Sequence, residues 1–302
     1  MNNLAPIVLF TYKRVDTLKK TVEALAENSL AIESELYIYS DGSKGESDRE
    51  SIDLVRDYLN TITGFKQVHI KLSEKNKGLA NSIINGVGDV FKTHDKVIVL
   101  EDDLITTSNF LHFMNQSLSK YESKKSVFSI SGFSFDFVED TESIYDVYFL
   151  NRGWSWGWAT WKNRWVDIDW EMKDYDKFIS NRKMREGFSL LGSDVLKMLN
   201  DQQKGKVDSW AIRWFYHQFK CNGLTLYPTK SKVSNEGFDQ FATHTKGNKS
   251  RYIPSIDLRG NSQFNFTDEI GITQFYQKQF QNRMGILQRI ISKFKTILGI
   301  RN

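Results

Sequence analysis

The chain has 302 residues, with 41 basic and 37 acidic residues, a formal net charge of +4, and 40% hydrophobic residues. This length and composition are sufficient to bury a full core, so they exclude a mainly disordered chain. The net charge is too small, and too scattered along most of the chain, for nucleic-acid binding as the main role. The single cysteine, Cys221, excludes an internal disulfide and a cysteine-rich zinc site.

No targeting or membrane-spanning segment is evident. Residues Met1 to Pro6 lack the basic and apolar regions of a signal peptide, and no run of about eighteen uncharged apolar residues occurs. We therefore expect a cytoplasmic protein that does not span a membrane. The aromatic content of 14%, including eight tryptophans, is high and favours a ligand-binding groove.

Short apolar runs alternate with helical periodicity over the first hundred residues, as is typical of βαβ units. The pattern predicts strands at 6–10, 36–39, 68–72 and 96–100, and helices at 16–27, 47–59 and 79–91. We therefore expect an α/β fold with a mostly parallel sheet flanked by helices. Beyond residue 105 the alternation weakens into tryptophan-rich loops and helices at 175–179, 194–201 and 209–221.

Charged residues follow three of the predicted strands. Arg14, Asp41 and the triplet Glu101-Asp102-Asp103 come directly after them, and open α/β sheets bind ligands at the carboxyl ends of their strands. An arginine there can grip phosphate in a two-pronged geometry, and an aspartate can accept hydrogen bonds from a base or a ribose. The alternatives are a surface ion pair between Arg14 and Asp16, and an ordinary Asp-Gly turn at Asp41.

Three successive carboxylates repel one another unless a cation or several donors compensate them. Mg²⁺ and Mn²⁺ prefer oxygen ligands and use one or two carboxylates together with substrate phosphates. Asp103 is the first choice of direct ligand, with Asp102 and Glu101 orienting ribose or ligand waters. The alternative is a solvated acidic turn that caps the next helix, since Thr106-Thr107-Ser108 also resembles a cap.

Four segments together resemble the glycosyltransferases of the GT-A fold, a Rossmann-like α/β fold. They are Pro-Ile-Val-Leu-Phe-Thr-Tyr-Lys-Arg at 6–14, Ser-Asp-Gly at 40–42, Asn-Lys-Gly-Leu-Ala at 76–80 and Val-Leu-Glu-Asp-Asp-Leu at 99–104. The chain is similar to the N-acetylglucosaminyltransferase I type, whose metal motif is also Glu-Asp-Asp, and to bacterial family 2-like transferases of polysaccharide assembly. The resemblance covers roughly residues 5–245.

The resemblance implies a donor site for a nucleoside diphosphate sugar, with UDP favoured. In it, Asp103 binds Mn²⁺ or Mg²⁺ at the diphosphate. Arg14 and Asp41 contact the nucleotide, and the same donor site includes Thr11, Tyr12, Asn81, Glu101 and Asp102.

The segment from Asn151 to Trp161 carries four tryptophans and two glycines. Relatives have a Gly-Trp segment here that lines the donor sugar and the acceptor, and flat aromatic faces suit sugar stacking. We expect Trp154 or Trp156 to contact sugar. The alternative is that the tryptophans pack a loop onto the sheet, which we favour for most of them.

Inverting transfer requires a base that takes the proton of the acceptor hydroxyl. The segment Val-Asp-Ser-Trp-Ala-Ile-Arg at 207–213 resembles the acidic-Trp segment that supplies this base, so Asp208 is the candidate catalytic residue. Ser209 stands where relatives can have a second acid, which leaves the position open by one residue. The alternative is that Asp208 caps the helix that follows.

A later segment resembles the Asn-X-Gly-X-Asp and Thr-His pattern of bacterial transferases. It implies that Asn235, Gly237 and Asp239 contact sugar or acceptor and that His244 contacts the metal or phosphate. The alternative is a flexible polar loop with an exposed histidine.

The end of the chain, 282–302, is basic and free of acids, with Leu287, Ile290, Ile291 and Phe294 on one helical face. Such a cationic amphipathic helix suits an anionic membrane surface. The alternative is a helix docked on its own domain or on a partner.

Taken together, these features predict a metal-dependent, inverting glycosyltransferase of cell-surface polysaccharide biosynthesis, peripheral on the cytoplasmic face of a bacterial membrane. The acceptor is a carbohydrate or lipid-linked oligosaccharide, and no nucleic acid is bound. We expect a domain over 1–245, with its nucleotide-sugar half at 1–110 and its acceptor half at 111–245, a linker or extension at 246–281 and the helix at 282–302. A nucleotidyltransferase and a non-catalytic carbohydrate-binding or scaffold protein remain alternatives.

Overall fold

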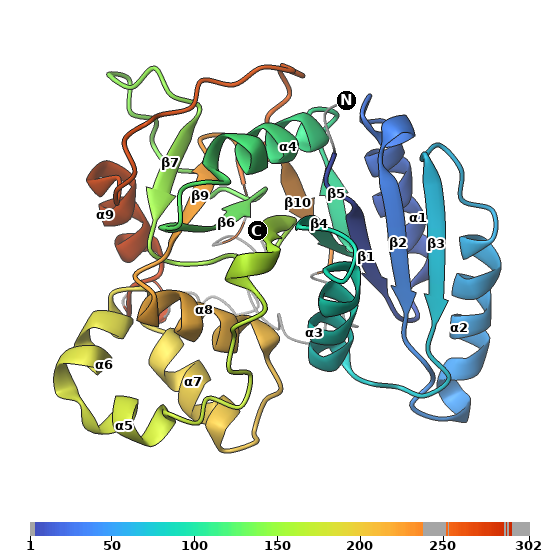
Figure 1. Cartoon of the computed structure of the whole chain (residues 1–302), viewed down its shortest axis with the longest axis horizontal. Helices are drawn as coiled ribbons and strands as arrows, with labels where there is room; N and C mark the ends of the chain where they lie inside the picture. The colour runs from blue at the N-terminus through green and yellow to red at the C-terminus, as the bar shows by residue number, and fades with distance from the viewer. Residues whose placement is uncertain (1–3, 238–251, 253, 287, 289, 292–302) are drawn as a thin grey trace.

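The computed structural model describes residues 4–237, 252, 254–286, 288, 290 and 291 (Figure 1). Its centre is an eight-stranded mixed sheet in the order β3-β2-β1-β4-β8-β6-β9-β7. The bounds of these strands are β1 (Ile7–Thr11), β2 (Glu35–Ser40), β3 (Gln67–Leu72), β4 (Lys96–Glu101), β6 (Val127–Ser131), β7 (Val147–Leu150), β8 (Trp158–Trp161) and β9 (Leu224–Pro228).

The first four strands of the sheet are parallel, as the alternating sequence pattern predicts. The register pairs Thr11 of β1 with Ser40 of β2, and Phe10 of β1 with Glu101 of β4. The carboxyl ends of these strands therefore lie at one edge, and the residues that follow them are brought together. A separate two-stranded sheet joins β5 (Leu104–Thr106) to β10 (Val233–Asn235) directly beyond β4.

Helices cover both faces of the sheet because its central strands are apolar on both sides. On β1, Ile7 and Leu9 enter one core, whereas Val8 and Phe10 enter the other. The first core is closed by α1 (Val15–Ala26), α2 (Glu46–Leu59), α4 (Phe110–Tyr121) and α9 (Gln274–Arg283). The second is closed by α3 (Leu79–Val90), α5 (Tyr175–Ser180), α6 (Arg182–Ser189), α7 (Val195–Gln203) and α8 (Trp210–Lys220), the last four forming one group in Figure 1.

The predicted helices and strands of the first hundred residues are confirmed, and the later helices predicted at 175–179, 194–201 and 209–221 are found as α5, α7 and α8. The rest of the second half differs from the prediction. Four strands of the large sheet and helix α4 lie where the sequence pattern weakens. The tryptophan-rich segment, predicted as loop, contains β8, whose four residues are all buried. A short strand buried on both faces has no alternation of polar and apolar residues to reveal it.

The segment predicted as a linker or extension, 246–281, contains most of α9, which packs on β7. The amphipathic helix predicted for 282–302 begins inside α9, which ends at Arg283 with Met284 as its C-cap. Residues 287, 289 and 292–302 of that prediction lie outside the described residues. Within the described residues, no helix is long and apolar enough to cross a membrane.

Two glycines in α3 give a matched test of this packing. A Cβ on Gly86 would lie 2.7 Å from Cε1 of Phe10, a buried ring between α3 and β1, whereas a Cβ on Gly88 would meet nothing within 4 Å. We expect Gly86→Ala to lower the free energy of unfolding by about 1–2 kcal/mol through overpacking. Gly88→Ala should raise it by roughly 0.5–1 kcal/mol through helix propensity. Urea denaturation measures both, and equal effects would contradict this packing.

Candidate active site

The acidic triplet lies at the carboxyl end of β4, beside the end of β1. Asp102 is buried, and Asp103 occupies the turn between β4 and β5. The guanidinium of Arg14 bridges the two aspartates, with its Nη2 2.7 Å from Asp102 Oδ1 and 2.7 Å from Asp103 Oδ2. The triplet is therefore not a solvated turn, and the alternative pairing of Arg14 with Asp16 is wrong.

The residues before Arg14 hold the other oxygen of Asp102. The hydroxyl of Thr11 donates to Asp102 Oδ2 at 2.9 Å, and the backbone amide of Tyr12 donates to the same oxygen at 3.2 Å. The loop after β1 and the loop after β4 are thus joined through one carboxylate. The sequence resemblance predicts that these residues belong to one donor site. In the structure, Thr11, Tyr12 and Arg14 all bind the carboxylate of Asp102.

One guanidinium is too little charge for three carboxylates. Burial raises the pKa of Glu101 to about 8, and the charges of Asp103 and Asp102 add to this shift while Arg14 opposes it. The pKa of Asp103 is also raised, first by burial and then by the charge of Asp102. Ionising all three carboxyl groups together is therefore unfavourable, and a bound cation would stabilise their charged forms.

A hard divalent cation fits this set of donors. The donor oxygens belong to carboxylates at the end of β4, and Asp103 is the one farthest along the chain from that strand. Within the described residues, no three histidine, cysteine, aspartate or glutamate side chains form a complete metal site. Mg²⁺ and Mn²⁺ take few protein ligands and complete their shell with water and phosphate, so Asp103 with a phosphorylated ligand is a suitable set.

Asp41, at the end of β2, is held by backbone amides. Its carboxylate accepts hydrogen bonds from Gly42 at 2.9 Å, from Lys77 at 2.9 Å and from Gly78 at 3.0 Å. Asp41 therefore joins the loop after β2 to the loop that begins α3. An ordinary Asp-Gly turn, the alternative for this residue, would lack the bonds to Lys77 and Gly78. A groove of about 650 Å³ opens beside it between α3 and β2–β3, and the acidic triplet does not line this groove.

Asn81 lies apart from these contacts. Its exposed side chain donates to the carbonyl of Lys77 at 3.0 Å, one turn back along the start of α3. Asn81 thus lies in the first turn of α3, and its side chain contacts the loop whose amides bind Asp41.

Strand β10 brings a distant segment against the triplet. Asn235 pairs with Leu104, and the amide of Glu236 donates to the carbonyl of Asp103 at 2.8 Å. Gly237 follows so closely that a Cβ on it would lie 2.0 Å from Asp103 Oδ2. Asn235 and Gly237 are therefore next to the predicted metal ligand, whereas Asp239 and His244 lie outside the described residues.

The tryptophan-rich segment reaches the same edge of the sheet because β8 is antiparallel to β4. The register pairs Trp158 with Val99, so the residues before Trp158 run past the end of β4. Trp158 and Trp161 are buried in the core, as the packing alternative predicted. Trp154 stacks on Phe133 with ring centroids 5.3 Å apart, and its indole Nε1 is buried without a hydrogen-bond partner in the described structure.

Trp156 is less buried than Trp154 and lies across it. Its ring meets Trp154 edge to face at 5.6 Å, and it meets Phe133 in the same way at 4.8 Å. The structure thus makes both predicted sugar-contacting tryptophans part of one aromatic cluster beside the acidic edge.

Asp208 lies immediately before α8. Its side chain is 57% exposed and forms an ion pair with Arg213, with Oδ1 2.8 Å from Nη2. The N-cap of α8 is Ser209, whose hydroxyl accepts from the amide of Ile212. The alternative that Asp208 caps the helix is therefore wrong, and its carboxylate stays open to solvent.

A further clamp on the loop after β1 was not anticipated from sequence. The Tyr12 hydroxyl donates to Asp48 Oδ2 at 2.5 Å, and Lys13 pairs with Asp48 Oδ1 at 2.7 Å. Asp48 thereby joins this loop to the first turn of α2. No local signal marks such a contact, because Asp48 is one of several acids in a charged helix.

These features define an α/β protein whose candidate ligand site combines an acidic strand end, bridged by an arginine, with an aromatic cluster. The sequence profile described as "Glycosyl transferase family 2" matches residues 7–171, which is more than half of the chain. The chain belongs to this family, and the GT-A resemblance is confirmed.

Individual relatives are distant. The chain is 21% identical to an Arabidopsis thaliana alpha-1,3-mannosyl-glycoprotein 2-beta-N-acetylglucosaminyltransferase, in an alignment covering 93% of this chain and 66% of the relative. The chain thus spans slightly less than two thirds of that protein.

Similar solved structures include S. aureus TarS 1–349, at 8% identity and a TM-score of 0.41, covering 77% of this chain and 60% of that one. Another is the mannosyltransferase PcManGT from Pyrobaculum calidifontis in complex with GDP-Man and Mn²⁺, at 11% identity and a TM-score of 0.30, covering 43% and 37%. These scores are too low to carry an argument, so the family assignment depends on the sequence.

The close approach of Gly237 to Asp103 can be tested directly. Gly237→Ala should displace the Asp103 carboxylate and weaken Mn²⁺ binding by roughly tenfold or more, as does loss of groups that orient a metal ligand. Titration followed by electron paramagnetic resonance measures this. Gly271→Ala, where an added Cβ meets nothing within 4 Å, is the matched control. Equal affinities of the two variants would show that Gly237 does not shape the site.

Proposed function

We propose that this chain is a glycosyltransferase that moves a sugar from a nucleoside diphosphate sugar, with UDP favoured, to a carbohydrate or lipid-linked oligosaccharide hydroxyl. The proposed reaction depends on Mn²⁺ or Mg²⁺, inverts the anomeric centre and serves cell-surface polysaccharide biosynthesis. The observation that carries the proposal is the cluster at the end of β4, where Arg14 bridges Asp102 and Asp103 at 2.7 Å each. Family membership supports the same chemistry.

Three adjacent carboxyl groups with one guanidinium suit a bound cation better than a bound phosphate alone. Asp103 is the proposed metal ligand, and the ion would stabilise the charge that develops on the nucleoside diphosphate as it leaves the sugar. Arg14 keeps Asp102 and Asp103 in fixed orientations. Asp41, Thr11 and Tyr12 then lie at the same strand ends, where they would position the nucleotide.

The tryptophan cluster is the proposed floor for the sugar. Trp154 is largely buried against Phe133 and packs on Trp156, so its contribution would be to hold Trp156 in place. Trp156 presents more surface. A sugar held there would lie near the end of β4, because β8 brings this segment alongside that strand.

Asp208 is the proposed base that removes the proton of the acceptor hydroxyl. Its carboxylate is exposed, and the ion pair with Arg213 fixes its orientation without burying it. A base must reach the hydroxyl through solvent-accessible space, and Asp208 meets that requirement.

The proposal predicts metal-dependent release of nucleoside diphosphate from at least one member of a panel of sugar donors. Asp103→Ala should abolish both turnover and Mn²⁺ stimulation. Asp208→Asn should lower kcat by roughly 10² to 10⁴, the usual contribution of a general base, with little change in donor KM. Coupled detection of released diphosphate measures each rate.

Asp201→Asn serves as the control, because Asp201 also forms a helix-surface ion pair, with Lys197. Binding of donor without turnover in the wild-type protein would favour the carbohydrate-binding alternative. Release of pyrophosphate from a nucleoside triphosphate would favour the nucleotidyltransferase. Metal and Asp103 proving irrelevant to both binding and turnover would contradict the proposal.

We also propose that the chain binds the cytoplasmic face of a bacterial membrane through 282–302. Among the described residues of this segment, Ile286 is 68% exposed and Ile290 is 47% exposed. Apolar side chains beside a basic, acid-free sequence suit an anionic lipid surface.

Liposome flotation tests this proposal. The full chain should float with anionic vesicles, and the double variant Ile286→Glu with Ile290→Glu should remain at the bottom of the gradient. Equal flotation of both proteins would contradict the membrane proposal.

A further inference from the structure

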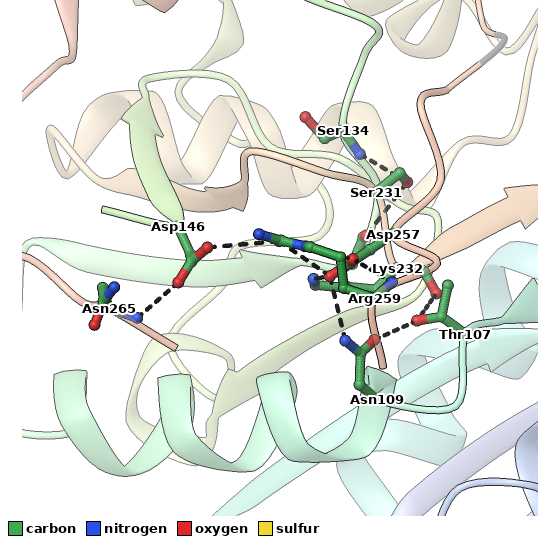
Figure 2. Close-up of polar contacts among 10 residues, drawn as sticks. Thr107, Asn109, Ser134, Asp146, Ser231, Lys232, Asp257, Arg259 and Asn265 are labelled. Carbon is green, nitrogen blue, oxygen red and sulfur yellow. Dashed lines mark hydrogen bonds and ion pairs between the residues drawn. The ribbon is translucent and has the colours of Figure 1, made fainter. Parts of the chain in front are cut away.

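A buried ion pair lies behind the candidate active site, at the end of β10 that faces away from Asp103. Lys232 and Asp257 are 1% and 0% exposed at their side chains and form a salt bridge. Figure 2 shows Asp257 held between Lys232 and Arg259. Arg259 donates to Asp257 through Nε at 2.9 Å, and Asn109 of the α4 N-cap donates at 3.2 Å.

Aromatic rings pack around the Lys232 end of this pair. The Lys232 ammonium lies 4.7 Å from the ring centre of Phe264 and 5.6 Å from that of Phe113. Burial lowers the pKa of Lys232, although hydrogen bonding to Asp257 opposes this shift. A buried ion pair contributes little net stability compared with packed apolar residues, so its directional bonds are the part that an apolar pair could not supply.

Backbone hydrogen bonds beside the ion pair also join the C-terminal segment to the strand that reaches the acidic triplet. The amide of Ser231 donates to Ser255, and the amide of Asp257 donates back to the carbonyl of Ser231, both at 2.9 Å. The carbonyl of Lys232 in turn accepts a hydrogen bond from the amide of Thr107 at 2.9 Å, which is the first bond beyond the β5–β10 ladder. Residues 255–257 therefore fix the chain immediately before β10.

The ladder that follows is short. It contains three residue pairs, from Val233 with Thr106 to Asn235 with Leu104, and a two-stranded ribbon of this size is not stable by itself. At its far end, the amide of Glu236 binds the carbonyl of Asp103, and Gly237 touches the Asp103 carboxylate. A displacement of the backbone at Lys232 would therefore be transmitted through the three residues of β10 to Glu236 and Gly237, which contact Asp103.

We propose that Lys232 and Asp257 are positioning residues for the donor site. Their buried ion pair locks the C-terminal segment to β10, keeps the β5–β10 ladder in register and thereby holds Gly237 against Asp103. This inference rests on the proposed function only for the ligand that the site binds. The mechanical link itself is independent of that function.

Lys232→Met tests the link because it removes the charge but keeps an unbranched apolar stem between the two phenylalanine rings. We expect binding of Mn²⁺ with UDP, measured by calorimetry, to weaken by roughly tenfold with full stoichiometry, as for other groups that orient a metal ligand. Hydrogen exchange should accelerate at the amides of Thr107 and Glu236 and remain unchanged in β1–β3. A merely structural role would instead lower the melting temperature and accelerate exchange throughout the protein.

Lys120→Met is the matched control. Lys120 also joins α4 to the C-terminal segment through an ion pair, with Asp268, but that pair lies at the surface with Asp268 83% exposed. Its removal should leave both binding and exchange at β5 and β10 unchanged, because exposed pairs contribute little.

If Lys232→Met does not fold, Lys232→Met combined with Asp257→Leu removes both buried charges and takes its place. Weakened binding and local exchange in the double variant support the proposal. Wild-type binding by either variant, unchanged exchange at the ladder or uniform acceleration of exchange overturns it. Should the wild-type protein bind neither ligand, the proposed function fails, and the exchange experiment still decides the positioning role.

Discussion

The structure depends on one electrostatic constraint, the compensation of three adjacent carboxylates at the end of a buried strand. A single guanidinium meets part of it, with Arg14 placed between Asp102 and Asp103 at 2.7 Å from each. That contact requires β1 and β4 to be neighbours and parallel, because only then do residues 88 and 89 positions apart along the chain meet at one edge. The upward shift in the pKa of Glu101 shows that the compensation is incomplete without a further positive charge. The clustering of these three carboxyl groups is the physical basis of the proposed metal-dependent function.

The rest of the architecture holds that edge in place from several directions. Thr11 and the amide of Tyr12 bind Asp102 from β1, and Asp48 binds the Tyr12 hydroxyl from α2. Beyond the end of β4, β10 places Gly237 against Asp103, and the buried Lys232–Asp257 pair joins the residue before β10 to the C-terminal segment. Each of these groups comes from a different part of the chain. Polar groups held by several bonds in this way keep a fixed orientation, which suits a site whose donors must already be oriented when a ligand arrives.

The sheet also explains why aromatic and acidic groups share one edge. β8 runs antiparallel to β4, so the chain enters it next to the place where β4 ends, and the tryptophans before it are delivered there. Charged groups that would bind a diphosphate and aromatic faces that would bind a sugar therefore lie side by side. A nucleoside diphosphate sugar presents the same two chemistries next to each other. Membership of glycosyl transferase family 2 and the arrangement of the site thus point to the same class of donor.

The first hundred residues determined their own elements, because apolar strands, amphipathic helices and the turns between them are local patterns. The same local patterns placed Arg14, Asp41 and the acidic triplet after strands, and the structure puts them at the carboxyl ends of β1, β2 and β4. Only the tertiary structure decided which of these groups touch: that Arg14 bridges two aspartates instead of pairing with Asp16, that Ser209 caps α8 instead of Asp208, and that Gly237 meets Asp103. It also revealed β6, β7, β8 and β9, whose short and fully buried segments carry no periodic signal. The Lys232–Asp257 pair was beyond sequence reasoning for the same reason, since a contact across 25 residues depends on how the chain returns to the sheet and not on the residues that lie beside it in sequence.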